Sequence, residues 1–327
     1  MPLQLGDRNE SVRRWRVVMN ARFGGLYTRL RGPLPTDTDE FGPRAAAWQT
    51  EYELRTGQAP DGVVSDNDLR ALGIPLPVDK RPWLFTVHGT GQPDPTGEGL
   101  PANAAKLVLD LYKWQPIGNY PATAFPMWGS IMKGVDELVL QIEQKLTGND
   151  DNFSMAGYSQ GAMVVAYVLK HHILDPKGRL HKFLHRLRKV VFWGNPMRQK
   201  GIAHFDEWIH EVAPPESHGI YTEDLLEGLE QYDFEVRDYA HKGDMYACNF
   251  DNDTDEYKRA ICKIVMRATD WVKGPDSVVS QLKELAMRPL PEMIATATAI
   301  IQAIKFGLST EHGYNIYPAV AFLRDRP

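Results

Sequence analysis

The segment from Phe153 to Val168 constrains the fold of this chain more than any other part of the sequence. It begins with four residues typical of a buried strand, continues as Gly-Tyr-Ser-Gln-Gly over residues 157–161, and ends as an apolar helical stretch. A Gly-x-Ser-x-Gly run between a strand and a helix is typical of a sharp turn that exposes the serine at the edge of an α/β sheet, because glycine tolerates a tight backbone. The run alone also occurs by chance in ordinary strand-to-helix turns. In this context it predicts that Ser159 is a nucleophile.

Short apolar runs alternate with helical stretches from Pro82 onward. Strands are predicted at residues 83–87, 153–156, 190–193 and 234–239, and helices near 102–112, 131–146 and 161–171. Strands separated by helices imply parallel crossovers, so we predict an α/β-hydrolase domain over residues 80–327, with a parallel sheet covered by helices on both faces. Residues 276–308 have little strand character and contain two helix-breaking prolines, which predicts a helical insertion beside the sheet.

The first 75 residues predict a separate small helical domain. Apolar side chains recur at helical spacing over residues 12–23 and 45–52, and Ser65 is suited to cap a third short helix that stops at Gly73. A stiff Pro-Leu-Pro run at residues 75–77 follows as a linker. A chain of 327 residues has room for one catalytic-sized domain and one small domain.

A nucleophilic serine needs a histidine to take its proton and a carboxylate to orient that histidine. In the α/β-hydrolase fold the three follow in the order serine, acid, histidine. Asp244 comes just after the predicted strand 234–239, where active-site loops gather, although it could instead be an ordinary turn-capping residue. The competing acids are Asp238, Asp251, Asp253 and Asp255.

His312 is the only one of the ten histidines that follows all of these acids. Chain order therefore predicts that His312 is the base and Asp244 its acid. On the same reasoning, replacement of His241, which precedes the acid, should leave most of the activity.

The loop after the first strand of this domain reads His-Gly-Thr-Gly-Gln over residues 88–92. A loop at this place commonly supplies one backbone N–H to the oxyanion hole, and the residue after the nucleophile supplies the other. We therefore predict that the amides of Thr90 and Gln160 hold the oxyanion. The glycines do not indicate a phosphate-binding loop, because no Gly-Lys-Ser/Thr follows them.

The charge, the apolar runs and the cysteines of the chain limit which partners and compartments are expected. The formal net charge of -5 provides no basic field for nucleic acid. No basic stretch followed by an apolar run is visible at the N-terminus, and no apolar run is long enough to span a membrane, so we expect neither a signal peptide nor a membrane span. Cys248 and Cys262 are expected to be reduced thiols, although one bridge between them remains open.

Two sequence patterns resemble metal-binding motifs but lack residues that those motifs require. The acidic run from Asp251 to Asp255 resembles the start of a calcium loop, but it lacks the glycine at the sixth position and the glutamate at the twelfth. His181 and His185 have helical i, i+4 spacing, but no glutamate follows His181 as in zinc proteases. We expect no metal and no cofactor.

The order of His-Gly-Thr-Gly at 88–91, the serine motif at 157–161, Gly-Asp-Met-Tyr at 243–246 and the late His312 resembles the cutinase-like esterases. Within that group, residues 80–327 are most similar to the lysin B family of mycobacteriophages. The resemblance implies hydrolysis of the ester between mycolic acids and arabinogalactan, by an enzyme that is made in the host cytoplasm and acts at the host envelope after release. Met245 and Ala247 stand where cutinases have proline and cysteine, so the chain departs from their disulfide pattern there.

The first 75 residues are similar, more loosely, to helical peptidoglycan-binding modules. The resemblance rests on Trp15, on Phe41-Gly42 before Trp48-Gln49, and on the Asp-Gly-Val-Val run at 61–64. It implies peptidoglycan as a partner of this domain, with a purely structural role as the alternative. For the whole chain, the alternatives are a general cutinase or lipase and a cell-wall-binding protein without catalysis.

Overall fold

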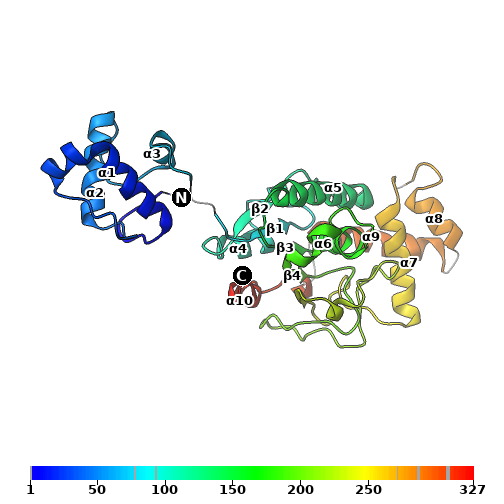
Figure 1. Ribbon diagram of the computed structural model, residues 1–327. Coiled ribbons are helices and arrows are strands. Elements are labelled where there is room, and N and C mark those ends of the chain that lie inside the picture. Colours follow the sequence, from blue (N-terminus) through cyan, green and yellow to red (C-terminus); the bar gives the residue numbers. More distant parts are fainter. Residues whose placement is uncertain (1, 77–78, 93, 271, 286–287, 307–309) are drawn as a thin grey trace. The chain divides into compact units, whose positions relative to one another are not determined.

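A computed structural model describes residues 2–76, 79–92, 94–270, 272–285, 288–306 and 310–327 (Figure 1). The chain divides into two compact units, Met1–Lys80 and Arg81–Pro327. Pro77, the last residue of the predicted linker, lies outside the described residues.

The smaller unit consists of the helices α1 (Glu10–Arg31), α2 (Pro43–Thr56) and α3 (Asp66–Ala71). The side chain of Asn9 caps α1 by accepting a hydrogen bond from the amide of Val12. Ser65 caps α3 in a reciprocal capping box with Asp68, as the sequence suggested.

The core of the smaller unit is aromatic. Trp15 of α1 and Trp48 of α2 are fully buried, and Trp15 packs against Phe41 at a ring distance of 5.1 Å. The side chain of Gln49 is also buried, where it donates hydrogen bonds to Glu53 and Asp68. Trp15, Phe41, Trp48 and Gln49, which carry part of the resemblance to peptidoglycan-binding modules, therefore lie in the interior of this unit.

The larger unit is built on a five-stranded sheet in the order β2-β1-β3-β4-β5, in which every neighbouring pair is parallel. The strands are β1 (Trp83–Val87), β2 (Lys113–Pro116), β3 (Phe153–Tyr158), β4 (Leu187–Trp193) and β5 (Glu235–Tyr239). The chain reverses its direction of winding between β1 and β3, which is where loops from the carboxyl ends of an α/β sheet leave a crevice. This is the α/β-hydrolase fold that the sequence predicted.

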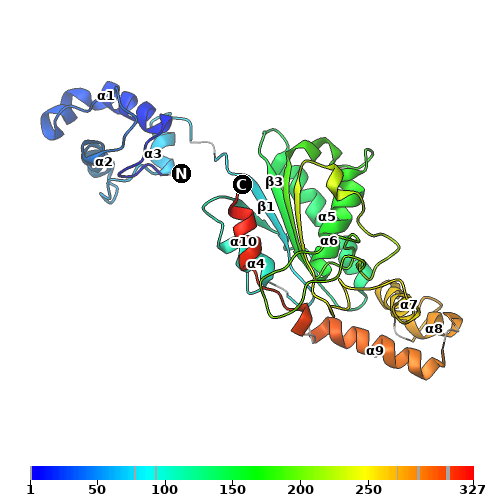
Figure 2. The same cartoon turned by 90° about the horizontal axis from the view of Figure 1, so that it is seen from below.

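Helices cover both faces of the sheet (Figure 2). On one face, Phe85, Met155 and Phe192 pack against α5 (Met127–Leu146) and α6 (Gln160–Val168). On the other face, Leu84 and Ala156 pack against α4 (Leu100–Lys106) and α10 (Tyr317–Arg324). Alternate residues of the central strands thus pack into two separate cores, and β1 and β3 are buried almost throughout, whereas the edge strands β2 and β5 carry more polar residues.

Three helices pack together at one side of the larger unit: α7 (Asp253–Arg267), α8 (Val278–Leu285) and α9 (Leu290–Phe306). The predicted insertion at 276–308 corresponds to α8 and α9, apart from residues 286–287 and 307–308, which are outside the described residues. The sequence analysis did not include α7. Short helical turns complete the unit: Leu169–Leu174, His181–Arg186, Leu229–Gln231 and Thr310–His312.

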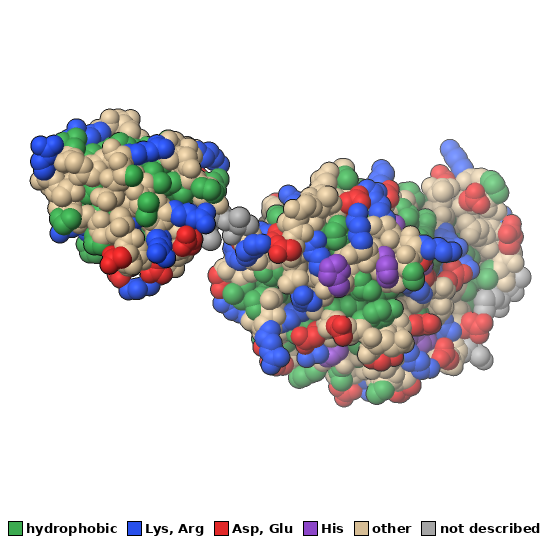
Figure 3. Space-filling view, in the orientation of Figure 1, with side chains coloured by type: hydrophobic (Ala, Val, Ile, Leu, Met, Phe, Trp, Pro, Cys, Tyr) green, Lys and Arg blue, Asp and Glu red, His purple; other side chains and the backbone are tan. Residues whose placement is uncertain are grey.

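Acidic and basic side chains are interspersed on the face of the larger unit seen in Figure 3. No helix within the described ranges combines the length and the apolar character needed to cross a bilayer.

Candidate functional site

Ser159 occupies the turn between β3 and α6, with a strained backbone at φ 54° and ψ −119°. Its amide donates to the carbonyl of Trp193 at the end of β4, at 2.9 Å. The flanking glycines are required by contact: a Cβ on Gly157 would lie 2.5 Å from the carbonyl of Gly161, and one on Gly161 would lie 2.3 Å from the carbonyl of Val87. The turn therefore has the geometry of a nucleophile elbow.

The structure brings Asp244 and His312 together, although 68 residues separate them in the chain. His312 Nδ1 lies 2.8 Å from Asp244 Oδ2, and both side chains are buried. Because a carboxylate only accepts, Nδ1 carries the proton and Nε2 is left as the basic nitrogen. No residue in the described part of the chain forms a hydrogen bond with Nε2.

Several other hydrogen bonds stabilise the charge on Asp244. Its Oδ1 accepts from the amide of Tyr246 at 2.9 Å, and its Oδ2 accepts from the hydroxyl of Tyr314. Burial alone would raise the pKa of Asp244, but attraction to His312 and these hydrogen bonds outweigh it and lower that pKa. Asp244 is therefore an anion that can stabilise a positively charged His312.

The end of β4 lies against both the serine turn and the histidine. Trp193 bonds to Ser159, and a Cβ on the next residue, Gly194, would lie 2.5 Å from Cε1 of His312. The residue before the serine, Tyr158, donates its hydroxyl to the backbone carbonyl of His312 at 2.9 Å. The three residues proposed from chain order therefore converge at one edge of the sheet.

Thr90 and Gln160 both line a pocket that Ser159 also lines. The side chain of Gln160 is fixed by Tyr120 and Ser130, whose hydroxyls donate to Oε1 at 2.5 and 2.9 Å. Gln160 is the first residue of α6, and the amides of a first helical turn have no partner within the helix. The hydroxyl of Thr90 is buried without a hydrogen-bond partner among the described residues.

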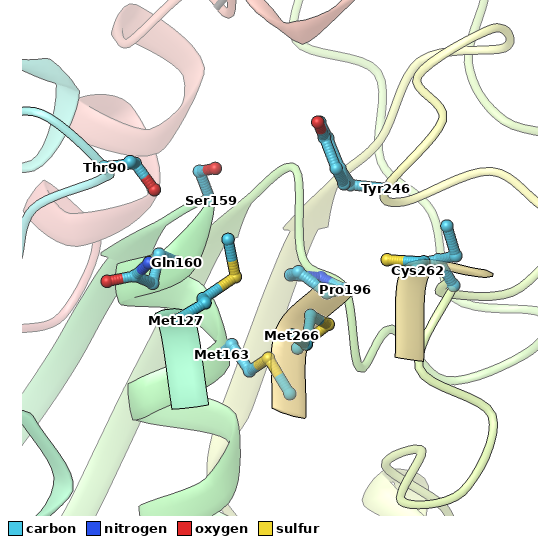
Figure 4. Close-up of a pocket in the computed structure, with 10 residues that line it drawn as sticks. Thr90, Met127, Ser159, Gln160, Met163, Pro196, Tyr246, Cys262 and Met266 are labelled. Atoms are coloured by element: carbon cyan, nitrogen blue, oxygen red, sulfur yellow. The ribbon is translucent and has the colours of Figure 1, made fainter. Parts of the chain in front are cut away.

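The pocket is almost entirely apolar. In Figure 4, Ser159 lies between Thr90 and Tyr246, and the pocket extends below it. Its other lining residues are Met127, Gln160, Met163, Pro196, Ile220, Cys262 and Met266. Unbranched methionine side chains adapt to different shapes, so this wall can accommodate flexible hydrocarbon.

Some residues of this site were missed by sequence reasoning. Cys262 and Met266 come from α7, and the apolar residues Tyr257, Ile261 and Val265 at helical spacing were a signal for that helix. Tyr314, two residues after His312, was also missed. No periodic sequence pattern predicts that a tyrosine hydroxyl will bond to a buried acid.

The described acidic side chains that were considered as alternatives to Asp244 make contacts away from His312. Asp238 is buried in β5, where it accepts from Asn195, and burial raises the pKa of its carboxyl to about 7. Asp251 pairs with Lys200, and Asp255 accepts from the amide of Phe250 just before α7. No group of three or more potential metal-ligating side chains occurs within the described ranges.

The two histidines at i, i+4 spacing and both cysteines have contacts that do not suggest a metal site. His181 and His185 lie on a short 3-10 turn, where His181 Nδ1 donates to the carbonyl of Ile173 at 2.9 Å and His185 is exposed. Cys248 and Cys262 are buried free thiols.

The fold, the strained serine turn and the buried Asp-His pair define the class of α/β-hydrolases. No family model matches the chain. It is 65% identical over 251 residues to endolysin B of Mycobacterium phage D29, which covers 75% of this chain and 98% of the relative. It is 64% identical over 251 residues to endolysin B of Mycobacterium phage L5, with the same coverage. The crystal structure of lysin B from mycobacteriophage D29 is similar to this structure with a TM-score of 0.71 and 64% identity, covering 75% of this chain and 99% of that one.

The chain belongs to the endolysin B family of mycobacteriophages. The fold and the family together indicate a hydrolase related to phage endolysins.

Proposed function

We propose that this chain is a serine esterase in which Ser159, His312 and Asp244 form the catalytic triad. The observation that carries the proposal is the 2.8 Å contact between His312 Nδ1 and buried Asp244, beside a serine on a strained elbow. His312 Nε2 takes the proton of Ser159 as Oγ attacks the ester carbonyl, and the carboxylate stabilises the imidazolium that forms.

The developing oxyanion is held by the amides of Thr90 and Gln160. His312 then gives its proton to the departing alcohol, which leaves an acyl group on Ser159. A water molecule, deprotonated by His312, releases the acid and restores the serine. These steps need no cofactor.

The proposed substrate is the ester that joins mycolic acids to arabinogalactan in the host cell wall. Two observations support it: relatives from mycobacteriophages are named endolysin B, and the pocket beside Ser159 is apolar, as an acyl chain requires. We place the action of the enzyme at the host envelope after its release from the cytoplasm. The smaller unit is proposed to bind peptidoglycan there.

The experiment that tests this substrate compares two kinds of ester. Purified protein is given soluble p-nitrophenyl esters and, separately, isolated mycolyl-arabinogalactan, and free mycolic acid is measured by chromatography. The proposal expects release of mycolic acid at a rate comparable to hydrolysis of the soluble esters. Hydrolysis of soluble esters without release of mycolic acid would identify a general cutinase or lipase. No hydrolysis of either would indicate a binding protein without catalysis.

A further inference from the structure

A second histidine-carboxylate pair lies next to the segment that carries His312. His241, just after β5, and Asp206 are both fully buried. His241 Nε2 lies 2.9 Å from Asp206 Oδ1 as an ion pair, although Nε2 forms no hydrogen bond with any of the described residues. Burial of a charged pair is costly, and neither residue has a part in the proposed triad.

This pair is bonded to the chain on both sides of His312. His241 Nδ1 donates to the carbonyl of Glu311 at 2.7 Å, and the amide of Asn315 donates to Asp206 Oδ2 at 2.8 Å. The ring of His241 also stacks on Tyr314, with centroids 4.3 Å apart and planes 22° apart. Residues 311–315 are therefore fixed before and after the histidine.

These contacts also determine how His241 is protonated. The carbonyl of Glu311 only accepts, so Nδ1 carries a proton. Asp206 is a carboxylate, so a lone pair on Nε2 at 2.9 Å would repel it, and Nε2 carries a proton as well. His241 is therefore an imidazolium that needs both protons to keep both contacts.

The groups that face His241 mostly favour this charge. Burial lowers the pKa of His241, but contact with Asp206, the bond to the Glu311 carbonyl and the nearby Asp244 together raise it above its usual value. The ring of His210 lies 5.1 Å away, and Tyr314 covers one face. Lys242, the next residue, is paired with Glu211 at 2.8 Å on the exposed side.

We propose that His241 and Asp206 are positioning residues that hold His312 toward Ser159, and that loss of one His241 proton as the pH rises weakens this positioning. The inference rests on the proposed function, because it takes His312 as the base. Chain order alone predicted that His241 is dispensable, whereas its contacts predict a partial loss of activity when it is replaced.

The sign of the pH effect follows from the protonated state. A group whose pKa is raised in the folded protein contributes its stabilisation fully at lower pH and loses it as the pH rises through that raised pKa. Deprotonated His241 keeps either the Glu311 contact or the Asp206 contact, but not both. Residues 311–315, which include His312, are then positioned by fewer contacts. Activity should therefore fall as the pH rises through the raised pKa of His241.

The test measures how fast a fluorophosphonate probe labels Ser159 in the full chain between pH 6 and pH 10. Labelling requires a serine activated by its histidine, and mass spectrometry identifies the labelled residue. His241→Gln is expected to slow labelling about 100-fold at pH 7.5, the size of effect that a small misplacement of a catalytic group produces. KM for a soluble ester should change less than kcat.

Asp206→Asn provides a second variant with a different expectation. Its amide can donate to a neutral Nε2 while its oxygen still accepts from Asn315, so His241 keeps the Glu311 bond without a second proton. The bond that Asp206 Oδ1 accepts from the amide of Trp208 at 3.2 Å is lost in this variant. Labelling should slow less than in His241→Gln and should no longer fall at alkaline pH. His185→Gln, which removes an exposed histidine, is the matched control and should keep the wild-type rate and pH profile.

Two outcomes separate failure of this inference from failure of the proposed function. If the wild-type protein is not labelled at Ser159, the proposed triad fails. If Ser159 is labelled but Asp206→Asn keeps the wild-type alkaline fall, or folded His241→Gln keeps the wild-type rate, the positioning role is overturned. Circular dichroism establishes whether each variant is folded. If His241→Gln does not fold, the pH profile of Asp206→Asn decides whether the positioning role is correct.

Discussion

At the scale of single residues, Ser159→Ala should abolish ester hydrolysis and leave the fold intact, because Ser159 lines a pocket and is only half-buried. Loss of a triad nucleophile lowers turnover by roughly a million-fold. Asp244→Asn should cost about ten thousand-fold, since it favours the wrong tautomer of His312 without removing it. Initial rates on a soluble ester measure both effects. A tenth of the wild-type rate in Ser159→Ala would remove this serine from the mechanism.

His88 gives a prediction about stability and pH. Its side chain is buried, and burial lowers the pKa of His88 to about 4, against a small opposing effect of Asp94. Between pH 6.5 and 4 the unfolded chain binds a proton that the folded chain does not, so acid lowers the free energy of unfolding.

The variant His88→Leu lacks this proton. It should therefore lose less free energy of unfolding than the wild type between pH 7 and pH 5, as measured by urea denaturation. Equal losses in both proteins would show that His88 is protonated in the folded state.

Chain order was sufficient to predict the pairing of Asp244 with His312, because the fold restricts where each member of a triad can lie. It could not predict Asp206 or the bond from Tyr314, since both depend on how loops that are distant in the sequence pack around a buried charge. For the same reason it could not predict the contacts of His241 with residues 311–315, and the prediction that His241 can be replaced with little loss of activity still has to be tested.

At the scale of elements, the serine turn depends on the close approach of α6 to β1. In Gly161→Ala the new methyl group would lie 2.3 and 2.4 Å from the carbonyl oxygens of Val87 and His88, so backbone must move. We expect a loss of about 1–3 kcal/mol in the free energy of unfolding and a large fall in kcat, because the adjacent Gln160 amide is displaced.

Gly129→Ala is the matched control within the same unit. Gly129 lies in α5 with no atom within 4 Å of an added Cβ, so alanine should stabilise the helix by up to about 1 kcal/mol. Denaturation and soluble-ester rates measure both variants. An active, stable Gly161→Ala protein would contradict the close approach.

The long periodic elements were predictable and the short ones were not. Runs of buried apolar residues predicted β1, β3 and β4, and β5 was predicted at 234–239 although only its last two residues are buried. The edge strand β2 is only four residues long, half-buried throughout and ends in proline, so it has no period to detect. Helix α7 had a clear apolar period, but the acidic run from Asp251 to Asp255 at its start was compared only with a calcium loop, and no helix was predicted there.

At the scale of the whole molecule, the smaller unit has its own aromatic core and no member of the proposed triad. Deletion of residues 1–80 should therefore change hydrolysis of a small soluble ester by less than about twofold and weaken action on intact cell wall. Rates on both substrates measure this. An equal loss on both would show that the smaller unit is part of the catalytic fold.

The most direct measurement of the central claim is the amount of free mycolic acid that full-length wild type and Ser159→Ala release from isolated host cell wall. The account predicts a steady release by the wild type and none above the enzyme-free background by the variant. Release by Ser159→Ala at the wild-type rate would contradict the role of Ser159. Absence of release by a wild-type protein that is active on soluble esters would contradict the substrate.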